Sequence, residues 1–483
     1  MTEQRKRWFA LYTLCLGTLM IVLDTTIVNV ALPSIRTSLG FSQTSLAWVI
    51  NAYMLTFGGL LLLGGRLGDL FGHRRLFLAG IGLFTAASLA CGLSTSEAML
   101  IAARAVQGVG GAVASAVGLS LVMTLFTEPA DRAKAMGING FVAPGGGAMG
   151  VLLGGVLTDV LNWHWIFLVN IPIGVIVCAL ALRLVPADGE RAQGQRLDIA
   201  GAVTVTAALM LAVDAIVNGN QYGWLSGRTD GLLGVAVALL GSFLVIESRT
   251  ANPLMPLRLF KIRNLAGANV VGVLWAGSMF AWFFLSSLYM QRVLGYSPLQ
   301  VGLAFLAPNL IMGGFSIGLA AKITMRFGVR APLGIGLLLA AAGLALLGRA
   351  PVNGNFATDI LPSMILLGVG AGVAFTPVLL AAMSDVAPQE AGLASGLVNT
   401  AFMMGGALGL AVLASAAASR TSSLTGSGSG QLEALTGGYH VAFMAGAAFA
   451  VLGAIVGAVV LRTRHFDASA HAPSAESLES IAA

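Results

Sequence analysis

The chain has 483 residues, of which 57% are hydrophobic and only 10% are charged. This composition excludes a soluble globular protein and indicates a polytopic helical membrane protein whose main partner is the lipid bilayer. The net charge of +6 and the pI of about 9.5 do not indicate nucleic-acid binding, because the basic residues lie between apolar spans.

Fourteen apolar stretches, each of about 17 to 25 residues, are separated by charged or Gly/Pro-rich breaks. Inner segments hold 20 of the 26 Lys and Arg residues when the termini are placed inside, and outer segments hold five. The positive-inside rule therefore predicts that both termini are cytoplasmic. The spans are expected to start near residues 10, 46, 76, 98, 135, 165, 198, 230, 265, 300, 332, 360, 391 and 440.

The first span, residues 9–32, contains a carboxylate, Asp24. Helical rise places Asp24 about 21 Å into a hydrocarbon layer of about 30 Å. A charge at this depth costs at least about 2.5 to 3.5 kcal/mol, so we expect Asp24 to face a cavity or a partner and to have a function. The alternative is a protonated carboxyl group that is hydrogen-bonded to a neighbouring helix.

The loop between spans 2 and 3, residues 65–75, has the sequence GRLGDLFGHRR. Gly65 and Gly72 permit a tight reversal, and Asp69 can pair with cations such as Arg74 or with the positive end of a helix. We interpret this loop as the latch of a gate on the inner side. An ordinary positive-inside loop would explain the arginines, but not the acid or the glycine spacing.

Span 4 has one small, polar face, formed by Arg104, Gln107, Gly108, Gly111, Ser115 and Gly118. Arg104 lies about 10 Å below the outer surface and needs a carboxylate or several carbonyl groups there. Because Asp24 lies at a comparable depth, we predict that Asp24 and Arg104 pair directly or through water. The alternative is a structural Arg104 that binds neighbouring carbonyl groups.

Span 5 is rich in glycine, which suits close packing and bending but not an isolated helix. No strand precedes this span and no Lys-Ser/Thr pair follows, so it is not a phosphate-binding loop. Its small residues and its proline are Gly137, Gly140, Pro144, Gly145, Gly146, Gly147, Gly150, Gly154 and Gly155.

An internal repeat with an offset of 256 residues indicates two six-helix bundles with two inserted helices. Asp69 has no acidic counterpart, because Met325 takes its place. We expect bundles at 1–184 and 256–463, a linker with accessory helices at 185–255, a cytoplasmic tail at 464–483 and a flexible outer loop at 418–438. The offset places Arg66, Gly72 and Arg74 onto Lys322, Gly328 and Arg330, Gly140 onto Gly396 and Gly150 onto Gly406.

Four stretches together resemble the major facilitator superfamily, specifically its fourteen-span drug:proton antiporter branch. They are residues 23–33, residues 65–75, Arg104-x-x-Gln107-Gly108, and residues 163–172 at the entry to span 6. The resemblance implies proton and substrate coupling by Asp24 and Arg104. It also implies an inner gate at Asp69, Arg74, Gly65, Gly72 and Arg132, and an antiporter helix with Pro144, Gly150 and Gly154. The family's Gly-Pro pair is Gly150-Val151 here, which leaves Pro144 as the position for a bend.

Aromatic residues and methionines are concentrated in spans 9 and 13 and suit a soft pocket for large apolar compounds. Neighbouring residues on a helix point about 100° apart, so Trp282, Phe283 and Phe284 cannot all face one cavity. For any single one of them we expect a lipid-facing position. The cavity candidates are Asn29, Gln107, Trp275, Phe280, Trp282, Tyr289 and Met403.

No pattern indicates an enzyme, a metal site or a cofactor. Cys15, Cys91 and Cys178 lie in apolar spans, as is typical of small core residues, and the five histidines lack metal-ligand spacing. We predict a monomeric, proton-driven exporter of amphipathic drugs or toxic compounds, with cationic compounds among the candidates, in a bacterial plasma membrane. The alternatives are an exporter dedicated to one endogenous metabolite or antibiotic, and a membrane sensor that does not transport.

Overall fold

A computed structural model describes residues 3–126, 128–188, 197–250, 253–387 and 390–462. The predicted tail at 464–483 lies outside these residues. Within them the chain is helical and contains no strand, which confirms the predicted all-α class.

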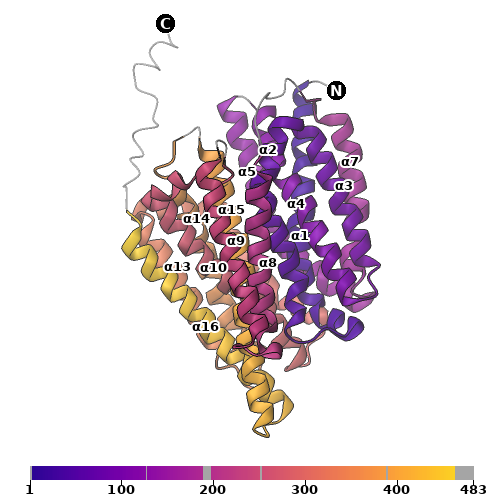
Figure 1. The fold of residues 1–483 in the computed structure, drawn as a ribbon. Coiled ribbons are helices and arrows are strands. Elements are labelled where there is room, and N and C mark those ends of the chain that lie inside the picture. Colours follow the sequence, from indigo (N-terminus) through magenta and orange to yellow (C-terminus); the bar gives the residue numbers. More distant parts are fainter. Residues whose placement is uncertain (1–2, 127, 189–196, 251–252, 388–389, 463–483) are drawn as a thin grey trace.

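The first half of the chain forms one group of helices, drawn in indigo and purple in Figure 1. These helices are α1 (Glu3–Leu39), α2 (Trp48–Phe71), α3 (His73–Gly92), α4 (Glu97–Leu125), α5 (Pro129–Val160), α6 (Trp165–Leu168) and α7 (Asn170–Leu184).

The second half forms a corresponding group on the other side of the molecule (Figure 1). A short 3-10 segment, η2 (Leu257–Lys261), leads into it. Its elements are α10 (Arg263–Arg292), α11 (Pro298–Gly314), η3 (Phe315–Leu319), α12 (Ala320–Phe327), α13 (Arg330–Leu347), η4 (Phe356–Ile360), α14 (Leu361–Met383), α15 (Ala391–Gly426) and α16 (Gln431–Val460).

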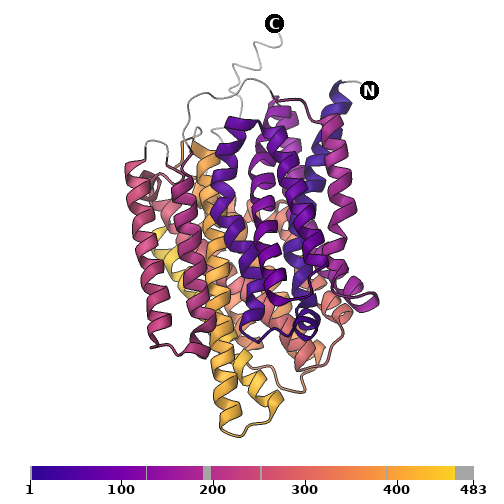
Figure 2. The same ribbon diagram turned by 45° about the vertical axis from the view of Figure 1, so that its right-hand side comes forward.

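Two helices lie between the halves in sequence: α8 (Ile199–Tyr222) and α9 (Gly227–Arg249). They fall in the range that we predicted for the inserted pair. Helix α8 packs against α2 and α15, and α9 packs against α8, so the pair covers the seam between the two groups (Figure 2). The approach of α8 is close, because a Cβ atom on Gly59 of α2 would lie 2.0 Å from Thr206 Oγ1.

Twelve helices of the described chain are long and apolar enough to cross a membrane. Two further apolar segments, Gly145–Val160 of α5 and Pro298–Gly314 of α11, are shorter. The chain is thus a polytopic membrane protein, whereas the count of fourteen spans stays a prediction.

The internal repeat is visible in the packing of the two halves. Gly72 and Gly328 both have a positive φ, 99° and 74°, at the reversal that precedes α3 and α13. A Cβ atom on Gly80 would lie 2.7 Å from the Ala114 nitrogen, and one on Gly336 would lie 2.8 Å from the Ala374 nitrogen. The same close helix contact therefore recurs in each half.

The prediction of a flexible outer loop at 418–438 was wrong. Helix α15 continues to Gly426 and α16 starts at Gln431, so the two helices project as a hairpin (Figure 1). A Cβ atom on Gly437 would lie 2.4 Å from Leu424 Cδ1, and one on Gly438 would lie 2.1 Å from Thr421 Oγ1. These glycines suggested a loop, but they allow two helices to approach closely.

Candidate functional site

A buried ion pair lies inside the first group of helices. Arg104 Nη1 of α4 lies 2.5 Å from Asp24 Oδ2 of α1. Both side chains are almost completely shielded from solvent, with 0% of Asp24 and 1% of Arg104 exposed. The predicted contact between Asp24 and Arg104 is therefore present, and it is direct.

Two amide side chains bind the other oxygen of the Asp24 carboxylate. Gln107 Nε2 of α4 donates to Asp24 Oδ1 at 2.8 Å, and Asn170 Nδ2 of α7 donates to the same oxygen at 3.0 Å. Gln107 Oε1 also accepts from Arg104 Nη1 at 2.8 Å. Three helices therefore hold the carboxylate, and three side chains donate to its two oxygens.

Ser88 of α3 connects this network to the backbone. Its hydroxyl accepts from Gln107 Nε2 at 3.2 Å and from Asn170 Nδ2 at 3.0 Å, and it donates to the Phe167 carbonyl oxygen at 2.9 Å. Neither Ser88 nor Asn170 was predicted to belong to the site. Asn170 could have been found, because it belongs to the motif at 163–172, whereas a lone serine in an apolar span carries no such signal.

The guanidinium group of Arg104 makes more contacts than the ion pair. Its Nε donates to the Val49 carbonyl oxygen of α2 at 2.9 Å. Its carbon Cζ lies 4.4 Å from the ring centroid of Tyr53 and 5.7 Å from that of Phe167, which are cation–π distances. Arg104 thus binds a carbonyl group and a carboxylate at once.

Small residues allow the helices to come close enough for these bonds. A Cβ atom on Gly108 of α4 would lie 2.5 Å from the Tyr53 carbonyl oxygen of α2. In α5, a Cβ atom on Gly150 would lie 2.8 Å from the Leu23 oxygen, and one on Gly154 would lie 2.6 Å from the Ile27 oxygen. The predicted antiporter helix therefore packs against α1 at the level of Asp24, and α5 is continuous through Pro144 and Gly150.

The aromatic residues of α10 are more deeply buried than we predicted. Trp282, Phe283 and Phe284 are all buried, so the expectation that any one of them faces lipid was wrong. The reason is that α10 is an interior helix packed against α14, α15 and α16, so most of its faces meet protein.

The candidates also lie at several levels of the molecule. Tyr289 Oη donates to the Pro351 carbonyl oxygen at 2.6 Å, while Trp275 and Trp282 are buried with ring nitrogens that lack a partner. Asn29 donates to the carbonyl oxygens of its own helix. Phe280 and Met403 are half-buried and lie where α2, α10 and α15 meet, close to Gly406 and Gly58. Substrate contact by these residues stays a prediction.

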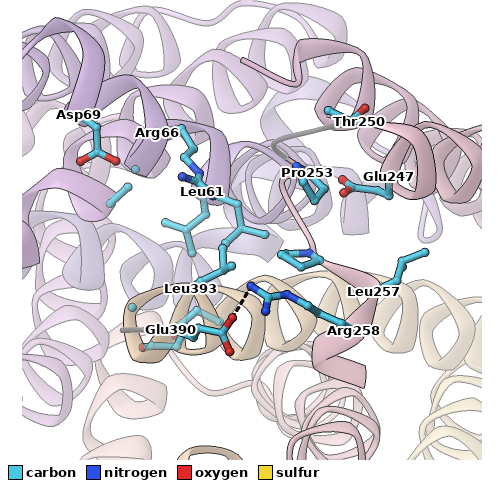
Figure 3. A pocket seen from close by; sticks show the side chains of 18 of the residues that line it. Leu61, Arg66, Asp69, Glu247, Thr250, Pro253, Leu257, Arg258, Glu390 and Leu393 are labelled. Atoms are coloured by element: carbon cyan, nitrogen blue, oxygen red, sulfur yellow. Dashed lines mark hydrogen bonds and ion pairs between the residues drawn. The ribbon is translucent and has the colours of Figure 1, made fainter. Parts of the chain in front are cut away.

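A pocket of about 1010 Å³ opens at the end of the molecule where α1 begins and α16 ends, which we call the terminus side. Its walls come from α2, α4, α9, η2 and α15, so it lies between the two halves and the inserted pair. Gly65, Arg66 and Asp69 line one wall (Figure 3). Arg258 of η2 and Glu390 form an ion pair on another wall.

Asp69 and Arg74, the two charged residues expected to pair in the latch, bind other partners in this structure. Asp69 Oδ1 lies 3.4 Å from His73 Nε2, and Arg74 Nη2 donates to the Leu182 carbonyl oxygen. The N-terminus of α3 is capped by Asp188, not by Asp69 as expected. Asp188 Oδ1 accepts from the Arg74 nitrogen at 2.8 Å, which satisfies a free N–H group at the helix end.

Two further latch positions have structural roles here. Gly72 is required at its place, because its φ is 99° and a Cβ atom there would lie 2.3 Å from Asp188 Cγ. Arg132 Nε donates to the Phe126 carbonyl oxygen at 2.9 Å and so fixes the turn between α4 and α5.

The halves are in close contact at the end opposite the terminus side. Ser287 Oγ and Gln291 Nε2 of α10 donate to the carbonyl oxygens of Asn29 and Val30 of α1, at 2.7 and 2.8 Å. A Cβ atom on Gly155 of α5 would lie 2.7 Å from the Pro298 oxygen of α11. The structure is therefore open on the terminus side and closed on the other.

Comparison with known proteins identifies the family. A sequence model described as Major Facilitator Superfamily matches residues 14–410 and 271–483. This chain belongs to the major facilitator superfamily. The resemblance noted at Arg104-x-x-Gln107-Gly108 and in the loop at 65–75 is thereby confirmed.

Relatives within the major facilitator superfamily are exporters and resistance proteins. Puromycin resistance protein pur8 of Streptomyces alboniger is 39% identical over 465 residues, which cover 95% of this chain and 92% of that protein. Cephamycin export protein CmcT of Amycolatopsis lactamdurans is 41% identical, with coverage of 86% and 85%. Multidrug resistance protein Stp of Mycobacterium tuberculosis is 36% identical, with coverage of 83% and 74%. These relatives are named as transport and resistance proteins, not as enzymes.

Solved structures of other transporters share the fold. An auto-inhibited POT family peptide transporter has a TM-score of 0.68 at 16% identity and covers 97% of this chain and 99% of its own. A bacterial homologue of the human lysosomal transporter Spinster has a TM-score of 0.65 at 16% identity, with coverage of 94% and 97%. At this identity the likeness establishes the facilitator fold alone.

Proposed function

We propose that this protein is a proton-driven exporter of amphipathic organic compounds that works by alternating access. The observation that carries the proposal is the buried carboxylate of Asp24, which is bound to Arg104 inside a membrane span. An intramembrane acid with a cationic partner suits a proton relay. The exporter and resistance names of the relatives support outward transport of organic compounds.

The network around Asp24 can accommodate a proton. Three donors bind the ionised carboxylate, one at Oδ2 and two at Oδ1. A carboxylate has about four acceptor sites, so Oδ2 can still take up a proton. Asn170 Oδ1 is buried without a partner, and rotation of this amide would offer an acceptor to the new O–H group. Protonation would then remove the attraction between Asp24 and Arg104 and favour a different arrangement of the helices.

The moving units in this proposal are the two bundles, residues 1–184 and 256–463, with residues 185–255 as the inserted linker. The terminus side is the cytoplasmic side, because the basic residues are concentrated there. The pocket of about 1010 Å³ would then receive compounds from the cytoplasm. Its lining combines leucines with acidic and basic side chains, as an amphipathic compound requires.

Transport in vesicles tests the proposal. We expect purified protein in inside-out vesicles with an acidic lumen to accumulate puromycin, lincomycin, a cephamycin or a lipophilic cationic dye, and a protonophore to abolish the accumulation. Vesicles without protein give the background. A failure of every compound to accumulate under the gradient would contradict the proposal and favour a sensor.

A second candidate is an exporter dedicated to one antibiotic. Relatives from Streptomyces and Amycolatopsis are each named for a single compound, whereas Stp is named for many drugs. A dose–response panel in a host without its own exporters separates the two. Protection against one compound supports the dedicated exporter, and protection against several unrelated compounds supports the multidrug exporter.

The unequal loops of the two halves give a prediction about the latch. We expect Asp69→Asn to increase opening on the terminus side, because it removes the acid that the closed state would pair with a cation. Met325→Gln should have no such effect, because Met325 provides no charge at the equivalent position. Labelling of an engineered cysteine at Ser395, which lines the pocket, reports the opening. Equal labelling rates in both variants would contradict an asymmetric latch.

A further inference from the structure

The inserted pair contains a buried acid next to the terminus-side pocket. Glu247, in the last turn of α9, is only 3% exposed, although it is one of the residues that line the pocket (Figure 3). Its Oε2 accepts from the Met255 nitrogen at 3.1 Å. Its Oε1 is buried and has no partner. A carboxylate oxygen in that position needs a donor.

A second buried acid lies near Glu247. Asp198 caps the start of α8 and is 6% exposed. Helix α8 packs against α9, whose last turn carries Glu247, so the two acids lie at the same end of the inserted pair. Asp198 Oδ1 accepts from the Gly201 nitrogen at 2.8 Å, but its Oδ2 is buried without a partner. Leu254 and Ala202 of α8 belong to one small apolar cluster, so the end of α9 and the start of α8 lie together.

Neither acid has an ion-pair partner among the residues that the structure describes. Within the described part of the chain, the ion pairs join His73 to Asp69, Arg104 to Asp24 and Arg258 to Glu390. None of them includes Glu247 or Asp198. The other charged groups that face this region are Arg66, Asp69, Arg258, Lys261 and Glu390 on the pocket walls, together with Arg249 on α9 itself.

We propose that Asp198 and Glu247 form a second proton-binding site, separate from Asp24, which reaches the terminus-side pocket through Glu247. Two buried carboxyl groups close together cannot both carry a charge without a large cost in free energy, and one bound proton removes that cost. The proton also supplies the donor that the free oxygens lack.

This site would give α8 and α9 a chemical role in addition to packing. Loss of the proton would place a negative charge on the wall of the pocket, next to entering compounds. This inference goes beyond the proposed function, because Glu247 could bind a proton even if protonation of Asp24 did not drive export.

Infrared difference spectroscopy of the full-length protein tests this site. In the Asp24→Asn background at neutral pH, we expect a carbonyl-stretch band from a protonated carboxyl group that is lost when Glu247→Gln is added. Glu433→Gln is the matched control, because Glu433 is exposed in the first turn of α16, and it should leave the band unchanged. A spectrum in which Glu247→Gln removes no such band would overturn the proposal.

A second measurement uses the unmodified sequence and so does not depend on the folding of a variant. An apolar carbodiimide reacts with protonated carboxyl groups, and mass spectrometry locates the adduct. We expect an adduct on Glu247 whose yield falls as the pH is raised. If no adduct formed on Glu247 at any pH and Glu247→Gln left the infrared band unchanged, Glu247 would be ionised. That result would overturn the proposed proton-binding site. Export by vesicles with the Asp24→Asn variant tests separately whether Asp24 carries the proton that drives export.

Discussion

Replacement of Asp24 by asparagine is expected to reduce gradient-driven export to the rate of vesicles without protein. The substitution removes the carboxylate of the central network and changes the side-chain volume very little. The three donors from Arg104, Gln107 and Asn170 would meet one carbonyl oxygen and one NH₂ group instead of two carboxylate oxygens. The protein should still insert and fold, because the apolar packing around α1 is unchanged.

Asp214→Asn is the matched control for this experiment. Asp214 is another acid inside a membrane span, but it lies in α8 and accepts from Asn218 of its own helix at 2.8 Å. We expect that variant to export at the wild-type rate with the wild-type dependence on pH. If Asp24→Asn vesicles also kept both properties, Asp24 could not be the proton carrier.

The second large effect is expected from Arg104→Lys, although the charge is retained. The planar guanidinium group binds the Val49 carbonyl oxygen through Nε and binds Asp24 and Gln107 through Nη1. A lysine ammonium is a strongly hydrated point charge that cannot reach both sides at once. We expect the unfolding free energy to fall by about 1 to 3 kcal/mol, because buried hydrogen-bonding groups lose their partners.

A double-mutant cycle measures whether this loss comes from the pair. Asp24→Asn leaves the Arg104 cation unpaired in a buried site, and Arg104→Gln leaves the Asp24 carboxylate unpaired. The double variant should therefore lose less stability in detergent melting than the sum of the two single variants. Arg36→Lys is the control for Arg104→Lys, because Arg36 is half-buried and donates from Nε to a backbone carbonyl oxygen, that of Phe41. If the stability losses of the two single variants simply added up in the double variant, Asp24 and Arg104 would not be coupled. Arg104 would then have a structural role alone.

Composition and spacing along the chain are sufficient to predict the class of protein and the contact between Asp24 and Arg104. The cost of a charge in a bilayer singles out Asp24 and Arg104, because each must have a partner and their depths agree. The repeat with Gly72 and Gly328 likewise indicates two similar halves. These conclusions need only composition, helical rise and spacing along the chain.

Spacing along the chain could not determine which helices meet. Asn170 of α7 binds Asp24, which lies 146 residues away in the sequence. Asn170 also binds Ser88 of α3, which lies 82 residues away. Asp188 caps α3 from a similar distance in sequence, 114 residues from Arg74. Ser88 and Asp188 are short polar side chains of a kind that is common in helices and loops, so nothing in the local sequence marks either of them as a partner.

The burial of the aromatic residues of α10 likewise depends on which helices surround α10. The turn of about 100° per residue separates Trp282, Phe283 and Phe284 on α10, but it does not say how many neighbours that helix has. Because α10 is enclosed by α14, α15 and α16, all three rings are buried. The glycines at 437 and 438 were misread for the same reason: a missing side chain can permit a turn or a close helix contact, and only the packing of α16 against α15 decides between them.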